Sequence, residues 1–261
     1  MAFGPAWFRN LRLLSVLIAA VCLCTGQSLP PAANSEVHLA LSCPVSPCRF
    51  RLGEVIPIDL VFSADVPGYV AYGSYRDRFE FSMALDTFTV SPSKGASDPV
   101  GKRRLVQAGR YNLNAPPLQE RSPVKVRLEF NQWFQFEKPG KYTVTVSSLR
   151  ASRISEMGGT INWDPSNPEK LTCGPIEVEI VDAEPDWQRR EFERILSALP
   201  ATLASITDAE RAAVRALTYL GTDDALQEIR KRLNTNQDRI DRDWRFAQLV
   251  LLERDSRTAS Q

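Results

Sequence analysis

The chain has 261 residues, 43% of them hydrophobic, so it can fill a folded core and does not have the composition of a disordered protein. Its 32 basic residues nearly balance its 31 acidic residues, which leaves a formal net charge of +1. No overall positive field attracts nucleic acid or an anionic membrane, and we therefore expect no nucleic acid partner.

The first segment has the pattern of a secretory signal peptide. Arg9 and Arg12 precede an uncharged run over residues 13–24, LLSVLIAAVCLC, which is shorter than the roughly 20 apolar residues of a transmembrane helix. We predict cleavage near Gly26, so that residues 1–26 are the signal and the mature chain is secreted or periplasmic, with no transmembrane span. A lipoprotein anchor on one of the two cysteines in this run is the alternative.

Export would place the remaining cysteines in an oxidising compartment, where disulfides form. Cys43 and Cys48 bracket a Pro-Val-Ser-Pro loop that can bend back on itself, and we predict a disulfide between them. The rival pairing joins one of these two cysteines to Cys173. Spacing does not decide between the two pairings, because a disulfide depends on the geometry of the two residues.

Alternating apolar and polar residues predict about seven short strands between residues 36 and 182. The clearest example runs from Val55 to Phe62 and places four aliphatic or aromatic side chains on one face. Two stretches rich in Gly, Pro and Ser, residues 91–122 and 150–170, are predicted to be loops.

The sequence LEFNQWFQFEKPGKYTVTVSSL, residues 128–149, resembles a corner between two strands of an immunoglobulin-like sandwich. In that corner an aromatic segment, a turn and a tyrosine follow one another, and the tyrosine hydroxyl bonds back to the backbone. The resemblance implies a mainly β, immunoglobulin-like antiparallel sandwich over residues 36–182, with Tyr142 and Trp133 as structural corner residues. An ordinary hairpin in another antiparallel sheet is the alternative.

After Pro185 the apolar residues recur about every 3.6 positions, which predicts helices. The sequence RAAVRALTYLGTDDALQEIRKRL, residues 211–233, resembles a HEAT-like repeat, in which an Arg- and Ala-rich helix ends in Leu-Gly and a second helix begins with acidic residues. We predict an all-α, four-helix segment over residues 186–253 that contains this hairpin. Thr207 is the predicted N-cap of its first helix, and Gly221 is the predicted C-terminal stop.

No pattern in the sequence predicts a catalytic residue, a metal site or a cofactor. The single histidine, His38, accompanies no GxSxG motif, and the cysteines lack the spacing of a zinc site. Tyr72, Tyr75 and Trp163 are the candidate ligand contacts, since aromatic rings near strand ends and loops can stack on a sugar or hold a peptide. Packing between strands is the alternative role for the tyrosines.

These features predict a non-catalytic exported binding or scaffold protein of a bacterial envelope, whose partner is a protein or an envelope polymer. One alternative is a proteinase-inhibitor-like sandwich that acts through the two predicted loops, which protruding, exposed loops would favour. A second alternative is an uncharacterised hydrolase, which a cleft holding two carboxylates of raised pKa would favour.

Overall fold

The computed structural model describes residues 36–73, 85–101, 117–118, 123–157, 160–199, 207–235 and 241–259, and within these ranges it leaves the side chains of 155–157, 160–163 and 165 undescribed. The predicted signal peptide and Tyr75 lie outside the described residues.

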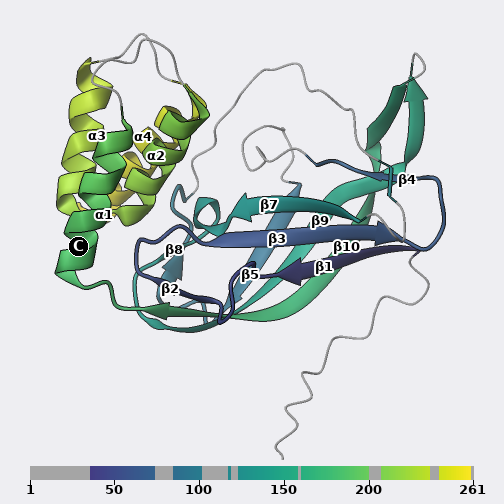
Figure 1. The fold of residues 1–261 in the computed structure, drawn as a ribbon, viewed down its shortest axis with the longest axis horizontal. Helices are drawn as coiled ribbons and strands as arrows, with labels where there is room; N and C mark the ends of the chain where they lie inside the picture. The colour runs from purple at the N-terminus through teal and green to yellow at the C-terminus, as the bar shows by residue number, and fades with distance from the viewer. Residues whose placement is uncertain are drawn as a thin grey trace, which may run out of the picture.

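Strands come first along the described chain, and the α-helices follow them (Figure 1). The strands are β1 (Val37–Ser42), β2 (Arg49–Arg51), β3 (Pro57–Ala64), β4 (Tyr69–Ala71), β5 (Asp86–Ser91), β6 (Ala96–Ser97), β7 (Val124–Glu129), β8 (Gln135–Phe136), β9 (Gly140–Met157) and β10 (Thr160–Val181). The helices are the short 3-10 helix η1 (Phe130–Gln132) and the α-helices α1 (Pro185–Ala198), α2 (Asp208–Leu220), α3 (Asp223–Thr235) and α4 (Arg242–Thr258).

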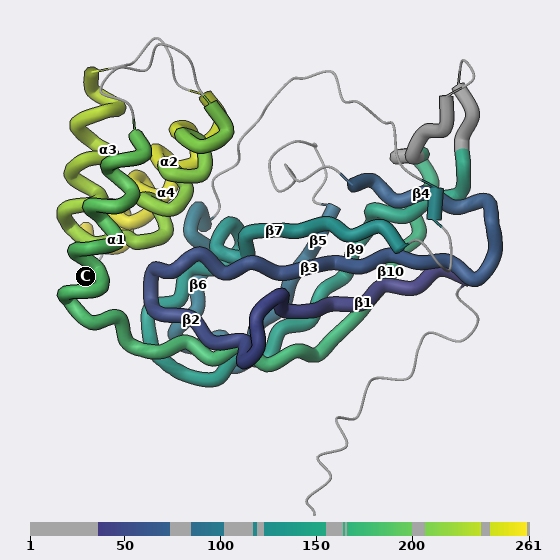
Figure 2. The backbone as a smooth tube through the Cα atoms, viewed as in Figure 1, coloured from purple at the N-terminus to yellow at the C-terminus, as the bar shows by residue number. Residues whose placement is uncertain are grey.

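The strands form two main sheets that share one apolar core. One sheet has the order β1-β3-β7, and the other has the order β2-β10-β9-β4, with β5 also pairing with β9. The strands β9 and β10 are 18 and 22 residues long and form an antiparallel hairpin with several register shifts. Figure 2 shows this hairpin curving behind the three-stranded sheet.

The predicted fold class, an immunoglobulin-like antiparallel sandwich followed by an all-α segment, is wrong. The chain is mixed α/β: β2 joins β10 in parallel, the sheet around β9 and β10 curls, and the helices contact the strands directly. Side-chain alternation reports which face of a strand is buried, but it carries no information on strand direction or sheet curvature. The division of the chain into separate units over 36–182 and 186–253 stays a prediction.

The predicted loop over residues 150–170 is also corrected by the structure. The described backbone there continues β9 to Met157 and begins β10 at Thr160. The register shifts between Trp163 and Pro168, and again between Glu169 and Leu171. Prolines and bulges interrupt the two-residue period, and for this reason the pattern does not indicate a strand.

An aromatic cluster fills one end of the strand core, where the chain turns from η1 into β9. The Trp133 ring packs edge-on against Phe88, with ring centroids 5.0 Å apart, and its indole N–H donates to the Asp86 carbonyl at 3.3 Å. The Tyr142 hydroxyl donates to the Lys138 carbonyl at 2.8 Å, which ties the start of β9 to the preceding turn.

The helices form where the 3.6-residue pattern predicts them. The Thr207 side chain accepts a hydrogen bond from the backbone N–H of Glu210 and caps α2, while Gly221 ends α2 in the left-handed conformation with φ of 62°. Leu217 and Ile229 are fully buried between the helices, and burying such a side chain contributes about 1.5–3 kcal/mol.

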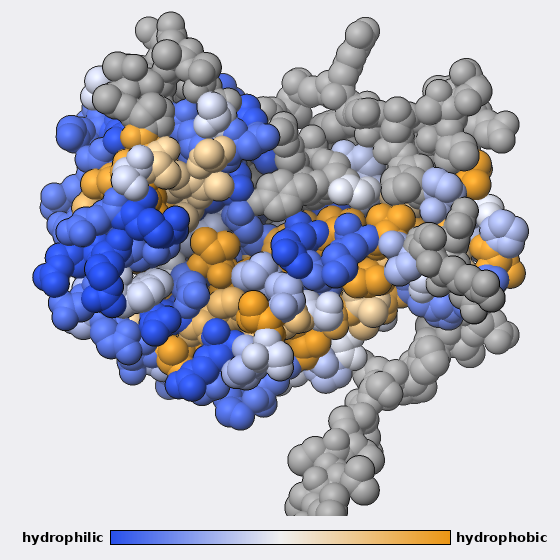
Figure 3. Space-filling model, viewed as in Figure 1, coloured by the Kyte–Doolittle hydropathy of each residue, from blue (hydrophilic) through white to orange (hydrophobic). Residues whose placement is uncertain are grey.

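The helices meet the strands along a seam of polar and apolar contacts. Arg215 of α2 donates to both carboxylate oxygens of Glu129 at 2.7 and 3.0 Å, and it also reaches Asp243 of α4 at 3.3 Å. The Tyr219 hydroxyl donates to Glu129 at 2.8 Å, and its ring packs on Phe246. Hydrophilic residues cover much of the outer surface of the helical end, as Figure 3 shows.

Candidate binding groove

An open groove of about 900 Å³ lies where β2, β10 and the start of β9 run side by side, next to the segment that leads into α1. We call it the β2 groove. It is lined by Arg49, Phe50, Arg51, Glu54, Pro139, Gly140, Lys141, Glu179, Ile180, Val181, Asp182 and Glu184. Its volume falls within the range of ligand sites in proteins, about 300–1,000 Å³.

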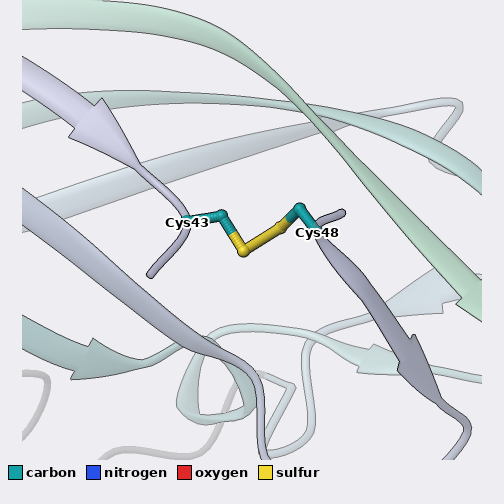
Figure 4. The surroundings of a disulfide bond; sticks show 2 residues. All are labelled: Cys43 and Cys48. Carbon is teal, nitrogen blue, oxygen red and sulfur yellow. A yellow bond between two sulfur atoms is a disulfide. The ribbon is translucent and has the colours of Figure 1, made fainter. Parts of the chain in front are cut away.

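A disulfide-closed loop brings β2 to this position. β1 belongs to the three-stranded sheet and β2 to the five-stranded sheet, so the chain must cross between them over residues 43–48. The disulfide joins Cys43 and Cys48, whose Cα atoms are 5.8 Å apart (Figure 4). Cys173 is free, so the structure does not form the rival pairing.

The outer edge of β2 is closed by its own local hydrogen bonds. The Arg51 N–H donates to a Glu54 carboxylate oxygen at 2.8 Å, and the Glu54 N–H returns a bond to the Arg51 carbonyl at 3.0 Å. The Arg49 N–H donates to the Pro47 carbonyl at 2.9 Å. Because an added strand needs free backbone groups along an edge, a ligand would be recognised here mainly through side chains.

The cationic side chains of the groove are held by carboxylates. Arg51 lies 3.3 Å from Glu184 and also covers the Trp187 ring at 5.4 Å from its centroid. The backbone N–H of Glu184 itself and then the Arg51 guanidinium lower the pKa of the Glu184 carboxyl. These interactions keep that carboxylate charged and hold Arg51 across the groove.

Two further ion pairs complete the charged lining. Arg49 pairs with Glu179 at 3.6 Å, across neighbouring strands. Lys141 pairs with Glu177 at 2.8 Å, and this hydrogen bond raises the pKa of the Lys141 ammonium. All four side chains are more than one third exposed, so water competes for these pairs and a ligand can exchange with them.

Charged side chains make up much of the groove lining. The described residues that line it are charged, apolar or glycine, with no histidine, cysteine or hydroxyl-bearing side chain among them. The sole histidine, His38, lies on β1 and contacts Asp65 at 2.7 Å. Among the described residues, no group of three or more His, Cys, Asp and Glu side chains is placed to hold a metal ion.

Of the three aromatic residues predicted as ligand contacts, the structure describes the side chain of Tyr72 alone, and it does not line the groove. Tyr72 is 3% exposed and packs with Val70 and Leu85, so its ring faces the interior. Trp163 lies in β10 opposite Ile154, but its side chain is not described, and Tyr75 lies outside the described residues.

Sequence reasoning missed the groove because its parts are far apart in the chain. Residues 49–54, 139–141 and 179–184 converge only through the pairing of β2 and β9 with β10. The local signal in each stretch is a charge beside a strand, which by itself indicates an exposed face.

Comparison with protein-family models finds no match, and no curated protein matches the chain. Among solved structures, the chain is similar to the Pseudomonas fluorescens alkylpurine DNA glycosylase AlkC bound to DNA containing an abasic site analog, with 18% identity and a TM-score of 0.23. The match covers 58% of this chain and 32% of that chain.

This neighbour was solved bound to DNA, and we withdraw the expectation that nucleic acid is not a partner of this chain. A TM-score of 0.23 carries no argument about the ligand of this chain, and it does not assign an enzymatic activity. Within the described ranges, every helix is too short or too polar to cross a lipid bilayer.

Proposed function

We propose that this chain is a non-catalytic exported binding protein that recognises its ligand in the β2 groove. The observation that carries this proposal is the groove itself: an open space of about 900 Å³ whose charged side chains pair with one another across neighbouring strands. Such a surface can exchange its internal ion pairs for ion pairs with a ligand.

The state of the carboxylates favours binding over hydrolysis. A carboxylic acid that works as a general acid at neutral pH needs a raised pKa. In the groove, the pKa of Glu184 is lowered instead, and Glu54 uses one carboxylate oxygen to cap the backbone of β2. Glu184 therefore has the role of a fixed negative charge, and Glu54 has that of a structural acceptor.

Two features support export. The N-terminal sequence has the charge and apolar run of a signal peptide. The Cys43–Cys48 disulfide belongs to the oxidising compartments that exported proteins reach. Expression of the full chain in a bacterium, followed by fractionation and N-terminal sequencing, tests this part: the mature form is expected to begin near Gln27, and an unprocessed cytoplasmic chain would refute export.

The binding function is tested by selecting ligands from a random peptide library on the immobilised mature protein. The selected peptides are then titrated against Glu179→Trp, whose indole would project into the groove and obstruct it, and against Glu193→Trp, which places the same side chain on the exposed surface of α1. We expect Glu179→Trp to abolish binding and Glu193→Trp to retain it. Failure to select any peptide, or equal binding by both variants, would contradict the proposal.

A further inference from the structure

We propose that the β2 groove takes a polypeptide segment bearing lysine or arginine side chains. This inference rests on the proposed function and specifies its ligand. It depends on which of the charged groups in the groove are already neutralised within the protein and which remain available.

The groove is lined by three cationic side chains and four carboxylates. Each cation has a partner inside the protein: Arg49 has Glu179, Arg51 has Glu184, and Lys141 has Glu177, which lies just outside the lining. These three pairs leave two lining carboxylates, Glu54 and Asp182, without a cation among the described residues.

The two remaining carboxylates can accept hydrogen bonds from a ligand. Asp182 is exposed, and the described residues provide it with neither a hydrogen bond nor an ion pair. Glu54 accepts the Arg51 N–H with one oxygen, which leaves its second oxygen for another donor. A groove with this residual negative charge attracts ammonium and guanidinium groups and repels carboxylates and phosphates.

The ligand class follows from charge together with the closed edge of β2. Because the local bonds of Arg49, Arg51 and Glu54 occupy that edge, a bound chain gains little from backbone pairing. Long, flexible cationic side chains can instead extend from the ligand backbone to Asp182 and Glu54. We expect such binding to weaken as salt rises, since all the participating groups are near the surface.

The experiment measures fluorescence anisotropy of three labelled probes with the full mature protein: a short Gly/Ser peptide carrying lysines and arginines, its glutamate counterpart, and a single-stranded DNA oligonucleotide. The cationic peptide is expected to bind more tightly than the other two probes, with an affinity that falls as ionic strength rises. Asp182→Asn and Glu54→Gln are each expected to weaken it roughly two- to fivefold, as exposed ion pairs do. Both substitutions keep an oxygen acceptor, so the fold is retained.

Asp186→Asn is the matched control, because Asp186 is exposed, pairs with Arg189 at 2.7 Å and does not line the groove. Its affinity for the cationic peptide is expected to equal that of the parent protein. Preferential binding of the glutamate peptide or of the oligonucleotide, or an unchanged affinity in the Asp182→Asn/Glu54→Gln double variant, would overturn the inference. If neutral or acidic peptides bind and Glu179→Trp blocks them, the proposed function stands and only this inference falls. If no peptide of any charge binds, both fall.

Discussion

Arg150 and Asp86 form an ion pair in the interior of the strands, with Nη2 and Oδ2 2.6 Å apart and neither side chain exposed to solvent. The pair has further hydrogen bonds, because Ser148 donates to Asp86 at 2.8 Å and Arg150 donates to the Tyr72 carbonyl at 3.2 Å. A buried charge that keeps all of its partners is tolerated, whereas one that loses its partner is costly.

We predict that Arg150→Met destabilises the protein by about 3–5 kcal/mol, because it leaves the Asp86 carboxylate buried without a counter-charge. Urea unfolding followed by fluorescence measures the loss. Arg189→Met is the control, since the exposed Arg189–Asp186 pair is worth about 0–1 kcal/mol. Equal losses in the free energy of unfolding of the two variants would show that the buried pair stabilises the fold no more than the exposed pair does.

The contact between helices and strands gives a second prediction. Arg215 is 7% exposed and bonds to Glu129 on the strand side and to Asp243 on α4, so Arg215→Ala leaves two carboxylates at the seam without their shared cation. We expect a loss of about 3–5 kcal/mol in the free energy of unfolding. Arg230→Ala removes an exposed pair with Asp255 and is expected to cost at most about 1 kcal/mol. A seam held by apolar contacts alone would make the two losses similar.

Gly53 gives a steric test of the same seam. It has φ of +83°, and a Cβ added there would lie 2.8 Å from the Leu220 carbonyl oxygen at the end of α2. Gly53→Ala therefore adds a clash with backbone to the strain of a left-handed residue, which is about 1–2 kcal/mol. Gly68 has φ of +103° and open space around it, so Gly68→Ala adds backbone strain without a steric clash. Thermal unfolding should show the larger loss for Gly53→Ala, and a loss no greater than that of Gly68→Ala would argue against close packing of α2 on this turn.

The buried carboxyl of Glu210 should make the stability of the protein depend on pH. Its side chain is buried, and neither carboxylate oxygen has a hydrogen-bond partner among the described residues. Burial raises the pKa of the Glu210 carboxyl. The backbone N–H of Thr207 lowers this pKa in part, although it does not reach hydrogen-bond geometry. The negative charge of Asp241 raises the pKa further.

The folded state thus holds the Glu210 proton more tightly than the unfolded chain does. The resulting stabilisation is fully present below the ordinary value of 4.5 and is lost as pH rises through the raised pKa. Glu210→Gln should unfold with less dependence on pH between about 5 and 8 than the parent protein. Parallel curves for the two proteins in chemical unfolding would contradict the assignment.

Asp243 should be kept unchanged in both proteins, because burial raises the pKa of its carboxyl as well and gives a pH dependence of the same sign. Asp59 acts in the opposite sense, since its hydrogen bond with Arg127 lowers its pKa. Its stabilisation is present above the ordinary value of 3.8 and is lost as pH falls through the lowered pKa, outside the interval used for Glu210.

Local features of the fold could be predicted from the sequence alone. The alternation from Ile56 to Phe62 indicates a strand with one buried face, and these side chains are indeed almost fully buried in and beside β3. Thr207 and Gly221 mark the two ends of α2, because a hydroxyl cap and a left-handed glycine act within one turn of a helix. Such features depend on neighbours only a few residues away.

The mixed sheet, the seam and the candidate groove were decided by tertiary structure. Arg215 and Glu129 are 86 residues apart, and the groove combines residues from β2, β9 and β10 whose pairing includes a parallel contact. The same alternation of side chains is compatible with either strand direction and with several partners, so the composition of a strand does not select among them. Only the packing of the whole chain places Asp182 and Glu54 in the lining of the same groove, and the proposed ligand depends on that placement.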